Sequence, residues 1–407
     1  MKHHMEKVAD PFAVRDMDTS TPVLILGGKE NALSIVRRFG AMGIDVSVSG
    51  PADCWAIYSH HCKKRYKIPR KQDSGAFWAE LLLGASRQLA PGHIILACSD
   101  DAIEFLAHHE TELRQHYLFD GASSEQRLAL LDKQKTLDMA RAAGITTPNS
   151  WPISDADDLK NMRENAQFPL IVKPLNTARF AKVFGRKFFT VDKSFDDLEA
   201  KVQLARGRGF EVTVMEMIPG PDALLSSYYT YIDDNGDSLF HFTKRVLRRY
   251  PVNSGGATYH TTDWLPETAA EGLKFFKETG FRGLGNIEFK RDLRDGRLKV
   301  IEVNARFTAA QELAVRSGAP IDLVVYCHLT GQPAPSFTTF QHDVRYWYPM
   351  KDFLAFLQLR KRSELTFADW RNSLAPKQHV SPLHNADDLV PLFGAASAWL
   401  AKAVWGR

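Results

Sequence analysis

The chain has 407 residues, of which 44% are hydrophobic and 25% charged, which is ordinary for a globular protein of two or three domains. A formal net charge of +4 is too small, with basic residues too evenly spread, to indicate nucleic-acid binding. The four cysteines lack CxxC spacing and indicate reduced thiols in a cytoplasmic protein, and no apolar run approaches the roughly 20 residues that span a bilayer.

The N-terminal part predicts a tail followed by a doubly wound α/β domain. Residues 1–20 are polar, without the pattern of a secretory signal, and are expected to be a flexible tail. Within residues 21–122, an apolar strand ends in two glycines, and a helix and a second strand follow, which makes a βαβ unit. The glycine loop lacks GxGxxG spacing, so a nicotinamide-dependent dehydrogenase stays only as an alternative. One of Ser99, Asp100 and Asp101, which follow the strand 93–98, is expected to cap the helix 102–109 rather than contact a substrate.

The next unit is expected to begin with one helix over residues 123–143, on which Lys133 lies. The apolar strand 168–174 ends in Lys173, whose burial is costly unless its charge meets a partner such as a phosphate. The basic segment 175–187, which ends in Lys187, is expected to be a loop that closes over phosphates. A solvated hairpin tip is the alternative.

Residues 211–218 form a strand that runs into a linker after Glu216, and such a linker can hold an adenine through its backbone. Two alternating strands, 225–232 and 239–247, are then joined by a turn and predict an antiparallel sheet. Arg248 and Arg249 follow the second of them, ahead of a glycine-rich loop, which suggests an anion site.

A hairpin brings together the polar residues that indicate chemistry most directly. Its turn is Asp295-Gly296, so Glu288 on the first strand should lie near Glu302 and Asn304 on the second. Two carboxylates and an amide are hard oxygen ligands that suit Mg²⁺. Arg306 lies on the same face and is suited to a phosphate or a carboxylate.

The last segment, residues 336–407, is expected to be a mostly helical extension. Its final helix, over residues 386–404, is amphipathic and weakly basic. Packing on the body is the favoured interpretation, and a peripheral contact with a membrane surface is the alternative.

The motifs around Lys133, Lys173, Glu216, Glu288 and residues 302–306 occur in the order found in the ATP-grasp superfamily. Up to about residue 335, the chain resembles the predicted ATP-dependent carboxylate–amine ligases of the D-aspartate ligase type. This resemblance implies a Rossmann-like α/β pre-ATP-grasp domain over 21–122, then an α+β ATP-grasp domain over 123–335 whose flap subdomain is about 145–210. The helical extension follows these domains.

The resemblance also implies roles for particular residues. The contacts of ATP would come from three lysines for the phosphates, a linker for adenine and an acidic residue for the ribose: Lys133, Lys173, Lys187, Glu216, Met217, Ile218 and Asp222. Glu288, Glu302 and Asn304 would bind Mg²⁺, or Mn²⁺ in its place. Arg306 and Arg248 would be catalytic and stabilise the transferred phosphoryl group.

The implied activity is a ligase that joins a small-molecule carboxylate, such as an amino acid, to an amine through an acyl-phosphate, with release of ADP and phosphate. Two alternatives stay open: a nucleotide-binding regulatory module without turnover, and a ligase for a membrane- or lipid-linked substrate. A homodimer is also left open as a hypothesis.

Overall fold

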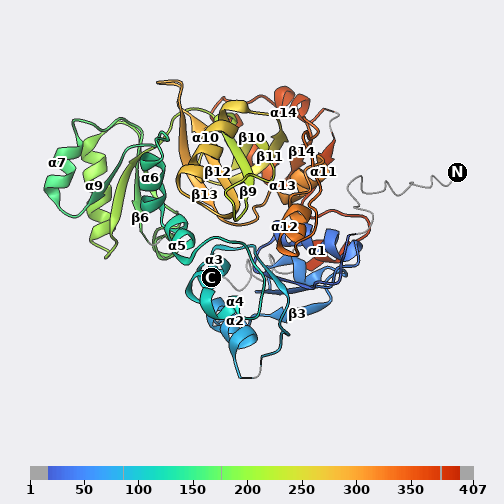
Figure 1. Ribbon diagram of the computed structural model, residues 1–407. Coiled ribbons are helices and arrows are strands. Elements are labelled where there is room, and N and C mark those ends of the chain that lie inside the picture. The colour runs from blue at the N-terminus through green and yellow to red at the C-terminus, as the bar shows by residue number, and fades with distance from the viewer. Residues whose placement is uncertain (1–16, 86, 176, 376–377, 395–407) are drawn as a thin grey trace.

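The computed structural model describes residues 17–394, apart from 86, 176 and 376–377, and these residues form three sheets (Figure 1). The first sheet is parallel, in the order β3-β2-β1-β4, as a doubly wound domain requires. Its elements are β1 Val23–Leu26, α1 Glu30–Ala41, β2 Val46–Gly50, η1 Trp55–Tyr58, β3 Lys64–Lys67, α2 Ser74–Leu83, β4 Ile94–Ala97, α3 Asp100–His108 and α4 Glu110–Arg114.

Two predictions about this domain have clear outcomes. The Ser99 side chain accepts a hydrogen bond from the Ala102 backbone N–H at 3.3 Å, so Ser99 is the one of the three residues that caps α3. Residues 1–16 of the predicted tail lie outside the described residues. For the last residues of the tail, the prediction of flexibility is wrong, because the Asp18 backbone is hydrogen-bonded to the side chains of Gln332 and Tyr326 in the C-terminal half.

The single helix predicted over 123–143 is two helices, α5 Ser124–Leu131 and α6 Lys133–Ala142. They are divided at Asp132, whose carboxylate accepts hydrogen bonds from the backbone N–H groups of Gln134 (2.9 Å) and Lys135 (3.2 Å). This is an N-cap, and it satisfies donors that a continuous helix would bond to the preceding turn. The break places Lys133 in the first turn of α6.

A small antiparallel sheet in the order β5-β8-β6-β7 forms the flap subdomain, which stands apart at one side of the molecule in Figure 1. Its elements are β5 Ser150–Ile153, α7 Ala156–Met162, β6 Leu170–Pro174, α8 Thr177–Phe184, β7 Phe189–Val191, α9 Phe195–Arg206 and β8 Val212–Glu216. The loop predicted over 175–187 is largely α8. Phe180 anchors this helix, since it is fully buried against the rings of Phe184, Phe189 and Phe210.

The central sheet has seven strands in the order β13-β12-β9-β10-β11-β14-β15. Its elements are η2 Asp222–Leu224, β9 Leu225–Ile232, β10 Phe242–Tyr250, β11 Gly256–Thr262, α10 Pro266–Glu278, β12 Gly283–Arg291, β13 Leu298–Asn304, α11 Gln311–Arg316, α12 Ile321–Leu329, β14 Arg345–Trp347, α13 Pro349–Lys361, α14 Phe367–Ser373 and β15 His379–Val380. The predicted helical extension therefore also contributes two strands, because β14 completes the edge that β11 leaves open.

The helix predicted over 386–404 lies mostly outside the described residues. Within the described part of the chain, none of the helices has the length and apolar character that crossing a bilayer requires.

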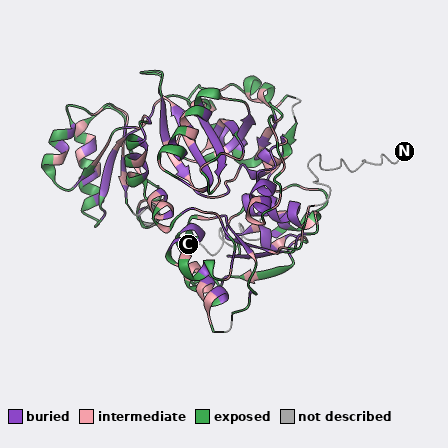
Figure 2. Cartoon of the chain, in the orientation of Figure 1, coloured by how far each residue is buried: buried purple, intermediate pink, exposed green. Residues whose placement is uncertain are grey.

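Buried residues are purple in Figure 2, and most of the hydrophobic ones belong to three clusters in the described part of the chain. Two of them combine side chains of the N-terminal domain with side chains of the central sheet and its helices, so these parts share their cores. The third contains only residues between Ile153 and Val214, so the flap subdomain has a core of its own. A subdomain with a separate core can move as a body against the rest of the molecule.

Candidate active site

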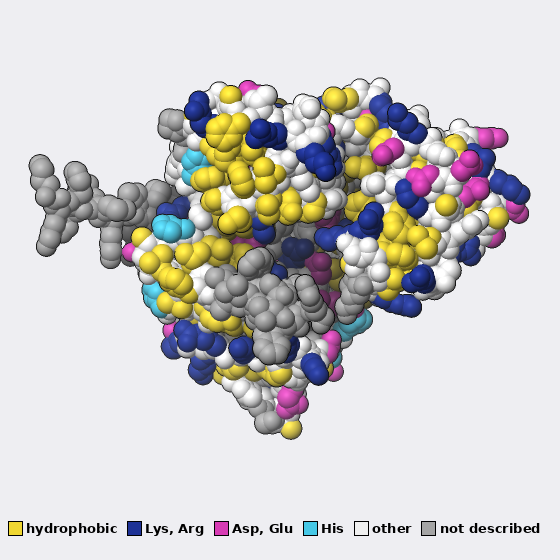
Figure 3. Space-filling model, turned by 180° about the vertical axis from the view of Figure 1, so that it is seen from behind, with side chains coloured by type: hydrophobic (Ala, Val, Ile, Leu, Met, Phe, Trp, Pro, Cys, Tyr) yellow, Lys and Arg dark blue, Asp and Glu magenta, His cyan; other side chains and the backbone are white. Residues whose placement is uncertain are grey.

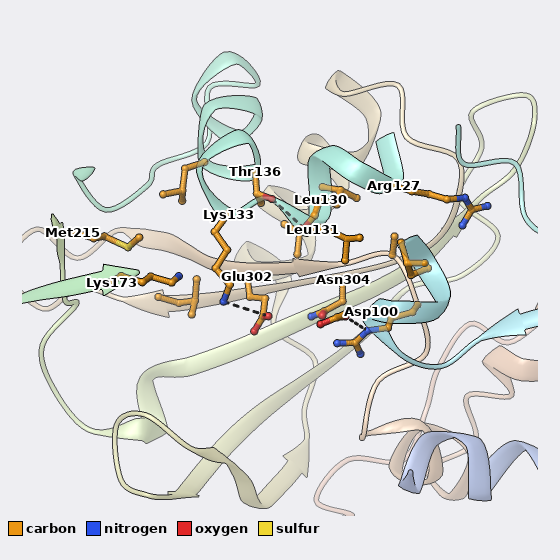
Figure 4. A pocket seen from close by; sticks show the side chains of 16 residues that line it. Asp100, Arg127, Leu130, Leu131, Lys133, Thr136, Lys173, Met215, Glu302 and Asn304 are labelled. Carbon is orange, nitrogen blue, oxygen red and sulfur yellow. Dashed lines mark hydrogen bonds and ion pairs between the residues drawn. The ribbon is translucent and has the colours of Figure 1, made fainter. Parts of the chain in front are cut away.

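A cavity of about 550 Å³ lies between the flap subdomain and one face of the central sheet. Charged side chains gather in the hollow between these two parts in Figure 3. On the flap side, the cavity is lined by β6, the segment before β7 and the linker after β8. On the body side, it is lined by strands β9 to β13, together with Glu30 and Tyr348. A smaller pocket adjoins it and is lined by Lys133, Lys173, Glu302, Asn304 and Arg306, among others (Figure 4).

The β12–β13 hairpin sets the acidic pair as the sequence predicts. Glu288 lies directly opposite Glu302, and Asn286 opposite Asn304. Directly opposed residues of antiparallel strands share a face, and opposed like charges are unfavourable without a cation between them. The Asn304 side-chain N–H group donates to Asn286 Oδ1 at 3.2 Å, which leaves the Asn304 amide oxygen available as a ligand.

This donor set fits a hard divalent cation. It consists of two carboxylates and an amide oxygen at one edge of the cavity, the oxygen chemistry that Mg²⁺ and Mn²⁺ take together with phosphate oxygens and water. Within the described ranges, no group of three or more His, Cys, Asp or Glu side chains is arranged to hold a metal on its own.

Lys133 and Lys173 lie beside Glu302 in the smaller pocket (Figure 4). Lys133 Nζ lies 3.7 Å from Glu302 Oε1. Burial and, after it, the charge of Lys133 lower the pKa of Lys173 to about 7, while Glu302 opposes the shift. Lys133 and Lys173 thus lie beside Glu302, and Lys187 lines the same cavity.

The linker after β8 lines the cavity through Glu216, Met217 and Ile218. The buried Glu216 carboxylate accepts hydrogen bonds from the side chain of Asn149 (3.1 Å) and from its backbone N–H (3.3 Å). The linker backbone is held by Lys290, whose Nζ donates to the carbonyls of Ile218 (3.0 Å) and Gly220 (2.8 Å). Lys290 was not predicted from the sequence, because strand alternation does not show what a buried lysine contacts.

Asp222 does not line the cavity, although the resemblance placed it at the ribose. Its carboxylate accepts hydrogen bonds from Arg249 Nε at 2.8 Å and from the Asn253 backbone N–H at 3.2 Å. In the structure it orders Arg249 and the loop that contains Asn253.

Arg248, predicted to be catalytic, does not line the cavity, because its side chain lies on the opposite face of β10. Its guanidinium makes two hydrogen bonds to the buried carboxylate of Asp352, at 2.7 and 2.9 Å, and it is 6% exposed. The register of β10 against β11 shifts between Val246 and Arg248 and again before Arg249. A bulge of this kind changes which residues share a face, so Arg249 lines the cavity and Arg248 packs against α13.

Arg306 lines both the cavity and the smaller pocket. Its Nε donates to Asp100 Oδ1 at 2.6 Å, which joins the end of β13 to the start of α3 in the N-terminal domain. The carboxyl edge of the parallel sheet is where ligands bind in open α/β domains. This position keeps Arg306 beside Asn304 and available to an anion.

Two further cavity residues were not singled out by the sequence. Lys244 on β10 and His260 on β11 are almost fully buried, and burial lowers the pKa of both. Alternation along β10 places Lys244 on the same face as the apolar Val246. A lysine on an apolar strand face is a signal in the sequence that could have identified Lys244 as a candidate site residue.

The fold is that of the ATP-grasp proteins, as the motif order suggested. Three solved structures share it: N5-carboxyaminoimidazole synthetase from Staphylococcus aureus (TM-score 0.57, 16% identity, covering 78% of this chain and 79% of that one), biotin carboxylase from Campylobacter jejuni (0.59, 19%, 79% and 74%) and L-amino acid ligase from Bacillus licheniformis (0.56, 16%, 77% and 75%). The staphylococcal enzyme is also known in complex with ADP.

In sequence, the chain is similar to the D-aspartate ligase of Enterococcus faecium (strain Aus0004), with 21% identity over 224 residues. The alignment covers 53% of this chain and 53% of that enzyme, so it spans about half the length of this curated relative. A comparison with models of protein families finds no match.

Proposed function

We propose that this protein is an ATP-dependent ligase that joins a carboxylate to an amine and releases ADP and phosphate. The observation that carries the proposal is the register of Glu288 with Glu302, beside Asn304, at the edge of a cavity where Lys133 and Lys173 converge. An acidic pair facing two lysines suits a metal-bound polyphosphate, since each phosphate oxygen can meet either the metal or an ammonium group.

The proposed contacts of the nucleotide follow from the cavity walls. Glu288, Glu302 and Asn304 hold Mg²⁺, which neutralises phosphate charge when it is bound. Lys133, Lys173 and Lys187 bind the phosphates, and the linker from Glu216 to Ile218 holds the adenine through its backbone. Arg306 stabilises the charge of the transferred group.

The proposed chemistry has two steps. A carboxylate oxygen of the acid attacks the terminal phosphorus of ATP, a new P–O bond forms, and the bond to ADP breaks. The amine then attacks the acyl carbon of the acyl-phosphate, phosphate leaves with the C–O electron pair, and the amine loses one proton. Positioning and charge neutralisation account for most of the acceleration in such transfers. A closed flap would exclude water, which otherwise hydrolyses the acyl-phosphate.

An amino acid is the substrate that we propose for one of the two positions. The support comes from the names of two similar proteins, a D-aspartate ligase and an L-amino acid ligase. The low identity and partial overlap leave the choice of amino acid to experiment.

A screen for ADP release tests the proposal. Purified protein is incubated with ATP, Mg²⁺ and pairs of acids and amines that include D-aspartate, and ADP, AMP and phosphate are measured. We expect ADP and phosphate to appear only with a particular acid. Release of AMP and pyrophosphate would overturn the proposal, and binding of Mg·ATP without any turnover would favour a nucleotide-binding regulatory module.

The variant Glu302→Gln separates the metal site from general damage to the fold. We expect ADP release to fall by at least about 100-fold, because the lost charge weakens metal and phosphate stabilisation by several kcal/mol. The melting temperature should not fall, since the substitution relieves the repulsion from Glu288. Glu278→Gln on the exposed face of α10 is the matched control and should keep full activity.

A further inference from the structure

A row of polar side chains crosses the face of the central sheet, starting from the acidic pair. The strand registers place Glu302 opposite Glu288, Glu288 opposite Ser227, and Ser227 opposite Lys244. Directly opposed residues point to the same face, and neighbouring strands are about 4.8 Å apart, so Lys244 lies about 10 Å along the row from Glu288. His260 joins this face on β11, opposite Val246.

Lys244, Ser227 and His260 of this row are buried. Lys244 is 3% exposed, Ser227 1% and His260 4%. No hydrogen bond of full geometry reaches either ring nitrogen of His260 or Ser227 Oγ, although the Ala257 backbone acts on the pKa of His260 and Ser227 on that of Tyr229. Within the described ranges, Lys244 Nζ has no hydrogen bond or ion pair, the Tyr229 ring centroid lies 6.0 Å away, and the charge of Glu288 partly opposes the effect of burial on the lysine pKa.

Buried polar groups without partners are costly, and a buried unpaired charge costs most. Lys244 and His260 both line the 550 Å³ cavity, so a bound molecule can supply the missing partners. A cationic lysine beside a histidine ring and a hydroxyl group favours an anion. Glu30 would repel one, but it lies on the α1 wall and accepts a hydrogen bond from the Tyr348 hydroxyl at 2.6 Å.

We propose that Lys244 and His260, supported by Ser227, form the subsite that binds the carboxylate of the acid substrate. This inference rests on the proposed ligase function and assigns residues to its acid. The carboxylate bound there would lie on the same sheet face as Glu288 and Glu302, within reach of the terminal phosphate of a nucleotide held at that pair.

The test is carboxylate binding to the full chain saturated with Mg·ADP, measured by calorimetry with succinate and D-aspartate as probes. We expect Lys244→Met to weaken binding of the probes at least tenfold and to leave the affinity for Mg·ADP within about twofold of wild type. We expect His260→Phe to weaken probe binding several-fold. The matched control is Lys160→Met, which removes a surface lysine of α7.

The stability of the empty protein provides a second readout. Removing an unpaired buried charge should keep or raise the melting temperature of Lys244→Met, whereas a lysine with a structural role would lower it on removal. The proposal is overturned if neither probe binds the wild-type protein, or if Lys244→Met binds the probes as well as wild type does.

The same variant distinguishes the acid from the terminal phosphate of ATP as the anion at Lys244. If Lys244→Met weakens binding of a non-hydrolysable ATP analogue much more than binding of ADP, the lysine belongs to the nucleotide and the acid subsite is refuted. Probe binding that depends on Lys244 in a protein that releases no ADP with any acid would uphold the subsite and refute the ligase function.

Discussion

Lys173 illustrates how much the surroundings of one residue change its chemistry. Burial and the nearby Lys133 lower its pKa to about 7, from an ordinary value near 10.5. The unfolded chain keeps this proton up to about pH 10.5, while the empty folded protein releases it near pH 7. The residue therefore disfavours the folded state at low pH, and this cost disappears as the pH rises from about 7 to 10.5.

Nucleotide binding should reverse this shift, because the phosphates favour the charged form of Lys173. We predict that binding of Mg·ADP takes up a proton near pH 8 and that the affinity falls as the pH rises above about 7. Calorimetry in buffers of different ionisation enthalpy measures the uptake. Lys173→Arg stays charged throughout this range and should show a smaller uptake, so an unchanged uptake in this variant would contradict the assignment.

At the scale of secondary-structure elements, the β12–β13 hairpin could be predicted because a short Asp-Gly turn fixes which residues oppose each other. Which residues of β10 face the cavity could not be predicted, because the bulge in this strand depends on how β11 packs beside it. The bulge turns Arg249 toward the cavity and Arg248 away from it. The break at Asp132 and the helix α8 also escaped prediction. The first depends on a local cap, and the second on the packing of Phe180 in the flap core.

The assignment of Arg248 to structure rather than catalysis predicts a loss of stability. Arg248→Met leaves the buried Asp352 carboxylate without its cation, which should lower the free energy of unfolding by about 3–5 kcal/mol. Arg245→Met on the same strand breaks only an exposed pair with Asp263 and should cost less than about 1 kcal/mol. Denaturant unfolding measures both. A stable Arg248→Met variant that has lost turnover would restore the catalytic role inferred from the sequence.

For the whole molecule, the described residues form a body and a separate flap. Buried ion pairs join the N-terminal domain to the C-terminal half: Arg38 to Asp322 at 2.8 Å and Arg37 to Asp388 at 3.0 Å. The flap core, by contrast, is formed in the described part of the chain by side chains between Trp151 and Val214. The mixed α/β and α+β character of the fold could be predicted from the sequence. The β14 and β15 strands could not, because they pair with the central sheet across a long stretch of chain.

This division predicts closure of the flap over a bound nucleotide. Mg·ADP should slow amide hydrogen exchange in β6, α8 and β7, since contacts with Lys173 and Lys187 would hold the flap against the body. The N-terminal parallel sheet, whose core already joins the body, should change little and serves as the internal control. Equal protection of both regions would indicate general stabilisation by the ligand instead of closure.

The central claim is that the acid passes through an acyl-phosphate, and isotope transfer tests it most directly. The acid identified by ADP release is prepared with ¹⁸O in its carboxylate and incubated with ATP, Mg²⁺ and the amine, and the released phosphate is examined by mass spectrometry. The proposed mechanism moves one carboxylate oxygen to phosphorus, so the phosphate should carry one ¹⁸O atom. Unlabelled phosphate, with all of the label retained in the product and the remaining acid, would contradict the mechanism.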